Sequence, residues 1–270
     1  MRDEKQPSLL FISHLYLGKR LQEIMKTLGL LIFALMFVCS VVSAQSVTTS
    51  GPAPAAAKAP SLSAENEMAK LAFQAHGGDK LKAVRSLVVR GSVDMTTSAF
   101  TQTFPGSFSM VISGEKYVLD LQSVQPFKQS FDGINTYCSI RGITLPPITS
   151  LGLPLLQKFG QAGYVIGALS PTAKKKRGFR MTAPDGNYTD FFIDEKTNQV
   201  AGYESAFEVN GNSITTSAVV DKYRLVDGVL LPEKYSQRFD LGQFTAYANF
   251  KAKEIEINRE IEDAVFSAPR

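Results

Sequence analysis

Few side chains beyond residue 44 have the type and spacing that catalysis needs. His76 is followed by two glycines, which is typical of a helix end, so a catalytic triad would have to be built around that end. We favour a structural role, in which His76 interacts with the last carbonyl groups of its helix. The carboxylate pairs Glu254/Glu256 and Asp194/Glu195 fall on a terminal strand among lysines and in a turn. Both pairs are interpreted as solvated surface groups.

The motifs of cofactor chemistry are also missing from the sequence. It has no cysteine and histidine cluster at metal-ligand spacing, no glycine-rich phosphate loop followed by a basic residue and no nucleotide-binding fingerprint. We therefore predict a protein that is not an enzyme and that holds no cofactor and no metal. Alanine at His76 and serine at Cys138 are expected to leave any activity unchanged.

One compact basic run, Lys174, Lys175, Lys176 and Arg177, stands out in an otherwise balanced chain. A run of this kind is typical of a solvated loop. We favour that interpretation, and docking onto anionic lipid or an acidic partner at a membrane of the cell envelope is the alternative. Both interpretations stay open at this point.

The N-terminal region has the features of a secretory signal peptide that begins at Met25. Lys26 supplies a positive charge, an apolar run spans 28–38, and Val42-Ser43-Ala44 offers a small-residue cleavage site. The apolar run is shorter than the roughly 18 residues expected of a spanning helix, and an uncleaved N-terminal anchor is the alternative. The predicted organisation is an N-terminal extension and signal peptide over 1–44, a disordered Ala/Pro/Ser/Thr linker over 45–62, and one β-rich domain over 63–270.

Charge and cysteine content exclude further classes. The first 44 residues hold five of the 29 basic and three of the 25 acidic residues, which leaves a net charge of +2 after cleavage. This balance does not indicate a nucleic-acid partner. Cys138 is then the only cysteine, so no internal disulfide can form, and we expect a monomer stabilised by apolar burial.

Helix and strand signals order the folded domain. Residues 63–76 carry apolar side chains at helical spacing and stop at two glycines, and a shorter helix is predicted from Asp79. Strands separated by turn residues follow, and the last three form a meander around the turns at Asp227-Gly228 and Leu241-Gly242. Pro232 is expected at a bulge or strand end, and Phe266 as a terminal anchor. Roughly ten to eleven strands result, more than a flat sheet supports.

Alternation of apolar and polar residues predicts which side chains face a common interior. In strand 87–95, Val89 and Val93 alternate with Arg90 and Asp94. The same period of two runs through the neighbouring strands and the last long strand. The candidate cavity residues are Leu87, Val89, Val93, Met95, Phe104, Phe108, Met110, Tyr117, Leu119, Leu121, Phe244 and Phe250.

The stretch 145–169 interrupts this pattern. It is apolar, holds three prolines and four glycines, and has no clean period, so no buried strand is expected there. It is either a loop or broken helix packed over the core, or a mobile lid over a cavity. The candidate lid residues are Leu151, Leu153, Leu155, Leu156, Phe159, Val165 and Ile166.

Several short motifs occur together along 65–269. They are His76-Gly77-Gly78, Ser86-Leu87 with Gly91, Asp132-Gly133, Phe192-Ile193-Asp194 with Thr197, YRLVDGVLLP at 223–232, and IEIN at 255–258 with Phe266 and Pro269. This combination resembles exported proteins related to the outer-membrane lipoprotein-sorting carriers (LolA/LolB-like proteins).

The resemblance implies an α+β, mostly β, fold: an unclosed, strongly curved antiparallel sheet, or half-barrel, with N-terminal helices and a helical or loop lid over its concave face. It also implies an apolar cavity that takes acyl chains in the periplasm. The carriers lock their lid with an arginine, and neither Arg90 nor Arg141 can be matched to it.

Two functions from different classes remain. The leading hypothesis is a periplasmic, non-enzymatic carrier or sensor that binds a lipid or an acylated protein in an apolar cavity. The alternative is an envelope interaction module of the same fold, with a filled core and no lipid cargo. An apolar void beneath 151–166 would favour the carrier, whereas close packing there would favour the module.

Overall fold

The computed structural model describes residues 63–267 except 142–143, 172–175, 210–211 and 243. The predicted signal peptide, the predicted linker and the basic candidates Lys174 and Lys175 lie outside the described residues. Within the described part, no helix combines the length and the apolar character needed to cross a membrane.

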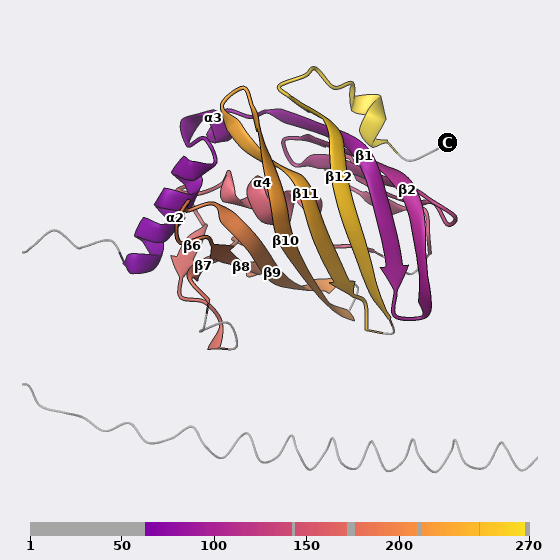
Figure 1. Cartoon of the computed structure of the whole chain (residues 1–270). Helices are drawn as coiled ribbons and strands as arrows, with labels where there is room; N and C mark the ends of the chain where they lie inside the picture. The colour runs from indigo at the N-terminus through magenta and orange to yellow at the C-terminus, as the bar shows by residue number, and fades with distance from the viewer. Residues whose placement is uncertain (1–62, 142–143, 172–175, 210–211, 243, 268–270) are drawn as a thin grey trace, which may run out of the picture. The chain divides into compact units, whose positions relative to one another are not determined.

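Twelve antiparallel strands form one sheet (Figure 1). They are β1 (Ser86–Thr97), β2 (Phe100–Ser113), β3 (Lys116–Gln122), β4 (Phe127–Phe131), β5 (Thr136–Cys138), β6 (Val165–Gly167), β7 (Gly178–Thr182), β8 (Tyr188–Ile193), β9 (Val200–Val209), β10 (Asn212–Val226), β11 (Val229–Asp240) and β12 (Thr245–Ile257). Their spatial order is β5-β4-β3-β2-β1-β12-β11-β10-β9-β8-β7-β6, so β5 and β6 are the two edges of an unclosed sheet. The predicted fold class is confirmed.

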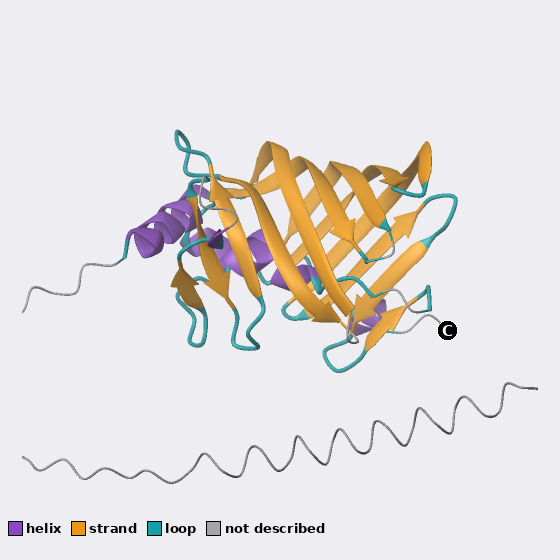
Figure 2. Cartoon of the chain, turned by 90° about the horizontal axis from the view of Figure 1, so that it is seen from below, coloured by secondary structure: helices purple, strands orange, loops and turns teal. Residues whose placement is uncertain are grey.

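The sheet curves strongly around its own concave face (Figure 2). Part of the curvature comes from β-bulges, which bend a strand and increase its twist. One bulge separates Arg90 from Gly91 in the pairing of β1 with β12. A Cβ atom at Gly91 would lie 2.0 Å from the carbonyl oxygen of Lys251, so only glycine permits this close approach. Tyr223 pairs with Pro232 beside another bulge, as predicted for that proline.

The predicted helices are confirmed with small differences in their ends. Helix α2 (Ala64–Ala75) begins after Ser63, whose hydroxyl oxygen accepts a hydrogen bond from the backbone N–H of Asn66, and packs against β6 and β7. Helix α3 (Asp79–Lys82) follows after Gly78 and begins at Asp79, as predicted.

His76 has different partners from those predicted. Its side chain is fully buried, and Nδ1 lies 2.9 Å from the carbonyl oxygen of Leu230. The backbone N–H of Val200 donates to Nε2 at 3.0 Å. Because a carbonyl oxygen can only accept, Nδ1 carries the proton and the ring is neutral. His76 therefore connects the end of α2 to β9 and β11, rather than satisfying the last carbonyls of its own helix.

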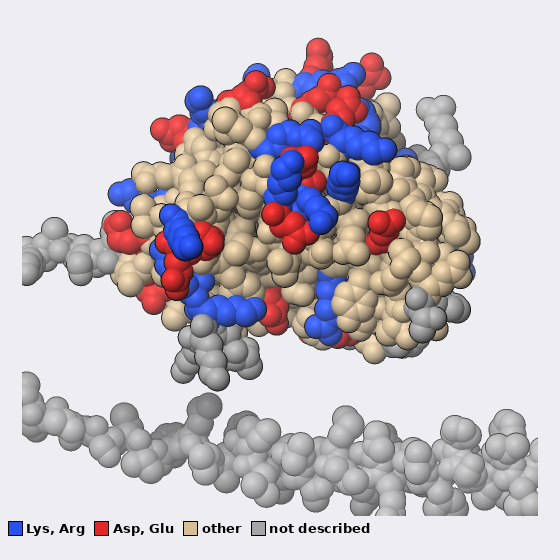
Figure 3. Space-filling view, in the orientation of Figure 1, with Lys and Arg blue, Asp and Glu red and all other residues tan. Residues whose placement is uncertain are grey.

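The convex face of the sheet carries mixed charge (Figure 3). Arg90 pairs with Glu254 at 2.9 Å, and Arg224 pairs with Glu233 at 3.0 Å. The Arg90–Glu254 pair is largely exposed and contributes little to stability, whereas the Glu233 side chain is only 15% exposed. Phe266, in the 3-10 helix η3 (Asp263–Phe266), packs against Val88, Val111 and Val118 on this face, which confirms its predicted anchoring role.

Two sequence predictions need correction. The stretch 145–169 contains the short edge strand β6, so Val165 and Ile166 lie in the sheet rather than in a lid, and Val165 is exposed. Phe244 lies in the turn before β12 rather than in that strand, because the carbonyl oxygen of Phe244 accepts a turn hydrogen bond from the N–H of Leu241. Strand β6 is too short, and too closely flanked by glycine, to give a strand signal of its own.

Candidate functional site

A short apolar plug occupies the concave face. It consists of residues 148–156, which form the 3-10 helix η1 (Ile148–Ser150) and helix α4 (Gly152–Leu156). Leu151, Leu153, Leu155 and Leu156 are all buried in the main core. In Figures 1 and 2, α4 lies inside the curve of the sheet. The predicted lid stretch is therefore an inserted plug.

Polar contacts hold the chain on both sides of the plug, and those before it are buried. Before it, the Gln129 side chain accepts from the backbone N–H of Leu145 at 2.7 Å and donates to the carbonyl oxygen of Leu145 at 2.9 Å. After it, the Gln157 side chain donates to the carbonyl oxygen of Val84. Lys158 pairs with Glu115 at 2.8 Å. No arginine contributes to these contacts, and Arg90 lies on the convex face with Glu254.

Helix α4 begins at Gly152, which lies against Tyr203 on β9. Gly152 has a φ of 53°, and a Cβ atom there would lie 3.0 Å from a ring carbon of Tyr203. A side chain at this position would be strained by the backbone and by the ring. Gly152 therefore lets α4 sit directly against β9.

An inner cavity of about 100 Å³ lies between the plug and the sheet. Five of the predicted cavity residues line it: Leu87, Val89, Met110, Leu119 and Phe250. Val93, Phe108, Tyr117 and Leu121 are buried in the same core without lining the cavity, and Met95 packs against that core. Phe104 is half-buried opposite Met95 on β2.

Sequence reasoning missed the wall that β9, β10 and β11 contribute. Its residues are Tyr203, Ala218, Val220, Leu231, Pro232, Tyr235, Gln237 and Phe239. The period of two in Tyr235, Gln237 and Phe239 could have revealed one part of it. The polar Gln237 conceals that signal, although its side chain is satisfied by the hydroxyl groups of Tyr203 and Thr216.

The wall also carries phenol groups in an apolar setting. Burial raises the pKa of Tyr203 and of Tyr235, so both hydroxyls stay protonated. The ring of Tyr235 stacks on Phe250 with 4.8 Å between centroids. No hydrogen-bond partner for the Tyr235 hydroxyl is found among the described residues, so a bound molecule could accept from it.

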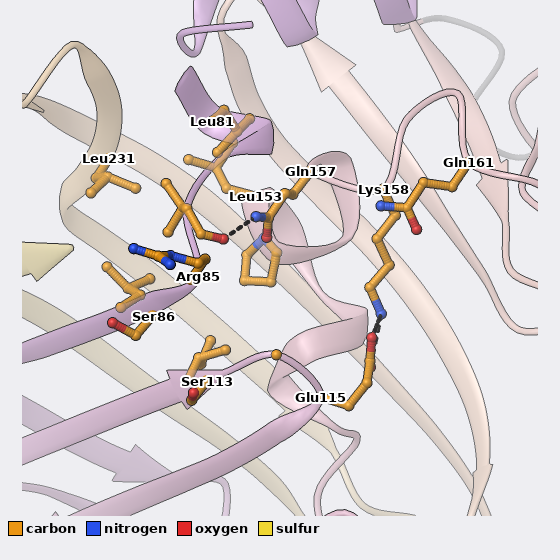
Figure 4. Close-up of a pocket in the computed structure, with 15 residues that line it drawn as sticks. Leu81, Arg85, Ser86, Ser113, Glu115, Leu153, Gln157, Lys158, Gln161 and Leu231 are labelled. Atoms are coloured by element: carbon orange, nitrogen blue, oxygen red, sulfur yellow. Dashed lines mark hydrogen bonds and ion pairs between the residues drawn. The ribbon is translucent and has the colours of Figure 1, made fainter. Parts of the chain in front are cut away.

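An outer pocket of about 500 Å³ opens beside the inner cavity (Figure 4). Leu81, Val84 and Ile112 give it apolar walls, and Arg85, Glu115 and Lys158 give it charge. Leu87, Leu153, Pro154 and Leu231 line both spaces, so these four residues separate the outer pocket from the inner cavity. The arrangement is a polar mouth followed by an apolar interior.

Several solved structures of other proteins are similar to the chain. One is a LolA superfamily protein from Nitrosomonas europaea, with 9% sequence identity, a TM-score of 0.44 and coverage of 73% of this chain and 97% of that one. The chain is similar in structure to LolA superfamily proteins.

Two further structures are similar at the same remote level. A DUF1329 family protein from Desulfovibrio piger has 8% identity, a TM-score of 0.40 and coverage of 75% of this chain and 97% of that one. A Vibrio parahaemolyticus domain, named for outer membrane lipoprotein sorting, has 8% identity, a TM-score of 0.39 and coverage of 73% and 97%. No protein-family model and no curated protein matches the chain.

The remaining candidates lie away from the plug. Arg177 donates to the carbonyl oxygen of Asp194 and to the side chain of Asn198, and Lys176 lies over the ring of Phe192. Their docking role stays a prediction. Within the described residues, no group of His, Cys, Asp or Glu side chains comes together that could hold a metal ion. Cys138 is half-buried on β5 and packs against the main core.

Proposed function

We propose that the chain is a periplasmic carrier or sensor, without catalytic activity, that binds one long acyl chain on its concave face. The acyl chain belongs to a lipid or to an acylated protein. The observation that carries the proposal is the apolar plug, whose four buried leucines fill a concave face between an open outer pocket and a residual inner cavity. Export through the predicted signal peptide is part of this proposal.

The inner cavity is too small to hold an acyl chain while the plug is in place. A dry cavity of about 150 Å³ accommodates one benzene molecule, and this cavity measures about 100 Å³. A bound chain must therefore displace the plug leucines and take their positions against the sheet. The plug is then a built-in competitor of the ligand.

Apolar transfer energies make this exchange sensitive to chain length. Exposing four leucine side chains costs about 6 to 12 kcal/mol, at roughly 1.5 to 3 kcal/mol each. Burying a chain of about sixteen carbons returns roughly 13 kcal/mol, and one of eight carbons only about 6 kcal/mol, at about 0.8 kcal/mol per methylene. Long chains should therefore bind, whereas short chains should not displace the plug.

The test uses two neighbouring residues that point to opposite faces of β10. Ala218 is 3% exposed and lines the inner cavity, whereas Val219 is 59% exposed on the convex face. We expect the wild-type protein to bind a fluorescent hexadecanoyl probe at micromolar concentration. Ala218→Phe should lower this affinity at least about tenfold because its ring fills the cavity, while Val219→Phe should leave it unchanged. Equal binding by both variants would argue against an internal site.

The small inner cavity is also the observation that favours the second candidate, an envelope interaction module with a filled core. Such a module would bind a protein partner on its surface and take up no acyl chain. A folded wild-type protein that binds no hexadecanoyl probe would support it over the carrier.

A further inference from the structure

We propose that the outer pocket binds the anionic headgroup, a carboxylate or a phosphate, of the amphiphile whose chain replaces the plug. This inference rests on the proposed function and names the charge of the ligand. The observation behind it is that, of the three charged side chains that line the pocket, two form an ion pair and the third does not.

Two of the three charged side chains in the pocket neutralise each other. Lys158 contacts both carboxylate oxygens of Glu115, at 2.8 and 2.9 Å. Burial lowers the pKa of Lys158, but the hydrogen bond and the negative charge of Glu115 outweigh burial and raise it on balance. The ammonium group therefore stays charged and engaged, and this pair adds no net charge to the pocket.

Arg85 is the third charge, and it has no counterpart. Its guanidinium group makes no hydrogen bond or ion pair with any residue in the part of the chain that the structure describes. The pocket therefore carries a net charge of about +1 from its lining side chains. A planar guanidinium offers paired donors that match the two oxygens of a carboxylate or a phosphate.

A hydroxyl group lies on the same rim. Ser113, at the end of β2, lines the pocket, and its side chain has no hydrogen-bond partner among the described residues. Figure 4 shows Arg85 and Ser113 on one side of the pocket and the Lys158–Glu115 pair on the other. The side chains of Gln157 and Ser86 instead donate to carbonyl oxygens of Val84 and Arg259. The Gln161 side chain, which also has no partner among the described residues, lies near Lys158 but is uncharged, so the available cationic donor lies on the Arg85 side.

The position of Arg85 fits the path of a chain. Arg85 immediately precedes β1, and Leu87, two residues later, lines both the outer pocket and the inner cavity. A headgroup at Arg85 would therefore place the first methylenes against Leu87 and Leu231, which belong to the sheet and stay in place when the plug is displaced. A cationic headgroup would meet the unpaired guanidinium and be disfavoured by like charge.

The test compares hexadecyl amphiphiles that differ only in their headgroup. Hexadecanoate, hexadecyl phosphate, monohexadecanoylglycerol and hexadecyltrimethylammonium compete at pH 7.5 against a neutral fluorescent monoacylglycerol. The wild-type protein should bind both anions about tenfold more tightly than the neutral lipid, since a hydrogen bond to a charged group carries about that factor. Arg85→Gln should remove the advantage, and Arg85→Glu should transfer it to the cationic amphiphile.

The control variant is Lys82→Gln. Lys82 is exposed on α3 and does not line the pocket, so its loss changes the net charge of the protein equally and should keep the preference for anions. Inorganic phosphate should not displace the probe because it has no chain. Displacement by phosphate alone would assign the pocket to a free anion and overturn the headgroup inference.

The remaining outcomes separate this inference from the proposed function. If anionic and neutral lipids bind wild-type protein and Arg85→Gln equally, the headgroup inference is wrong while acyl binding stands. If no hexadecyl amphiphile binds a folded wild-type protein, both are wrong.

Discussion

Replacing Leu153 by alanine is expected to raise the affinity for a hexadecanoyl chain about tenfold while it lowers the free energy of unfolding. Leu153 is buried on the plug and lines both the outer pocket and the inner cavity. A buried leucine-to-alanine change costs about 2 to 5 kcal/mol in the folded state. If about 1.4 kcal/mol of this loss weakens only the docking of the plug onto the sheet, the equilibrium constant for displacement of the plug by a ligand rises tenfold.

The matched control is Leu121→Ala. Leu121 is buried to a similar extent on β3, but it lies neither on the plug nor on the lining of either space. It should lose comparable stability without any gain in affinity, as measured by urea unfolding and by titration of the fluorescent probe. Lower stability together with higher affinity in Leu153→Ala, but not in Leu121→Ala, would identify the plug as a competitor of the ligand. A fall in affinity in both variants would instead show that the plug is ordinary core.

Replacing His76 by alanine should lower the free energy of unfolding by about 3 to 5 kcal/mol. The change leaves the N–H of Val200 and the carbonyl oxygen of Leu230 without their side-chain partner. Each unsatisfied buried group costs about 1 to 3 kcal/mol, and the contact with the ring of Tyr223 is lost as well. Gln74→Ala, on the exposed side of the same helix, should stay within about 0.5 kcal/mol of wild type.

The same histidine should make stability depend on pH. Burial lowers the pKa of His76 below its ordinary value of 6.5, although the hydrogen bond with Leu230 partly offsets this. Below pH 6.5 the unfolded chain binds a proton that the folded chain does not bind. The contribution of His76 to the free energy of unfolding is therefore complete above pH 6.5. As the pH falls below 6.5, this contribution decreases by at most about 1.4 kcal/mol per pH unit.

Urea unfolding of the wild type and of His76→Gln between pH 8 and pH 5 tests whether His76 causes this pH dependence of the free energy of unfolding. Glutamine keeps one donor and one acceptor but does not titrate. Equal pH dependence in the variant and in the wild type would assign the titration to other groups. An unchanged unfolding midpoint in His76→Ala would contradict the role of His76 in joining α2 to the sheet.

Local signals explain why most of the fold could be predicted from the sequence. The turn at Asp227-Gly228 lies between β10 and β11 as expected, and the glycines after His76 end α2. Each of these features depends on neighbouring residues only, through strand alternation or the conformations that glycine allows. The cavity residues of β1, β2, β3 and β12 follow from the same alternation.

What could not be predicted depends on contacts across the whole domain. The partners of His76 lie 124 and 154 positions away in sequence, and no local pattern connects them. Gln129 and Leu145 lie only 16 positions apart, but strand alternation does not predict their contact either. Whether the stretch 145–169 covers the sheet or enters it depends on how much volume the curved sheet encloses, which the pattern of one strand does not set.

Acyl binding on the concave face is tested most directly by native mass spectrometry of the full chain expressed in a host with an envelope and purified without detergent. We expect a fraction of the folded protein to carry one additional mass, and lipid extraction to release an amphiphile with a chain of about sixteen carbons. The Ala218→Phe protein should lack that mass, whereas Val219→Phe should retain it. Wild-type protein that is free of bound lipid, and that stays so after incubation with hexadecanoyl lipids, would contradict the account.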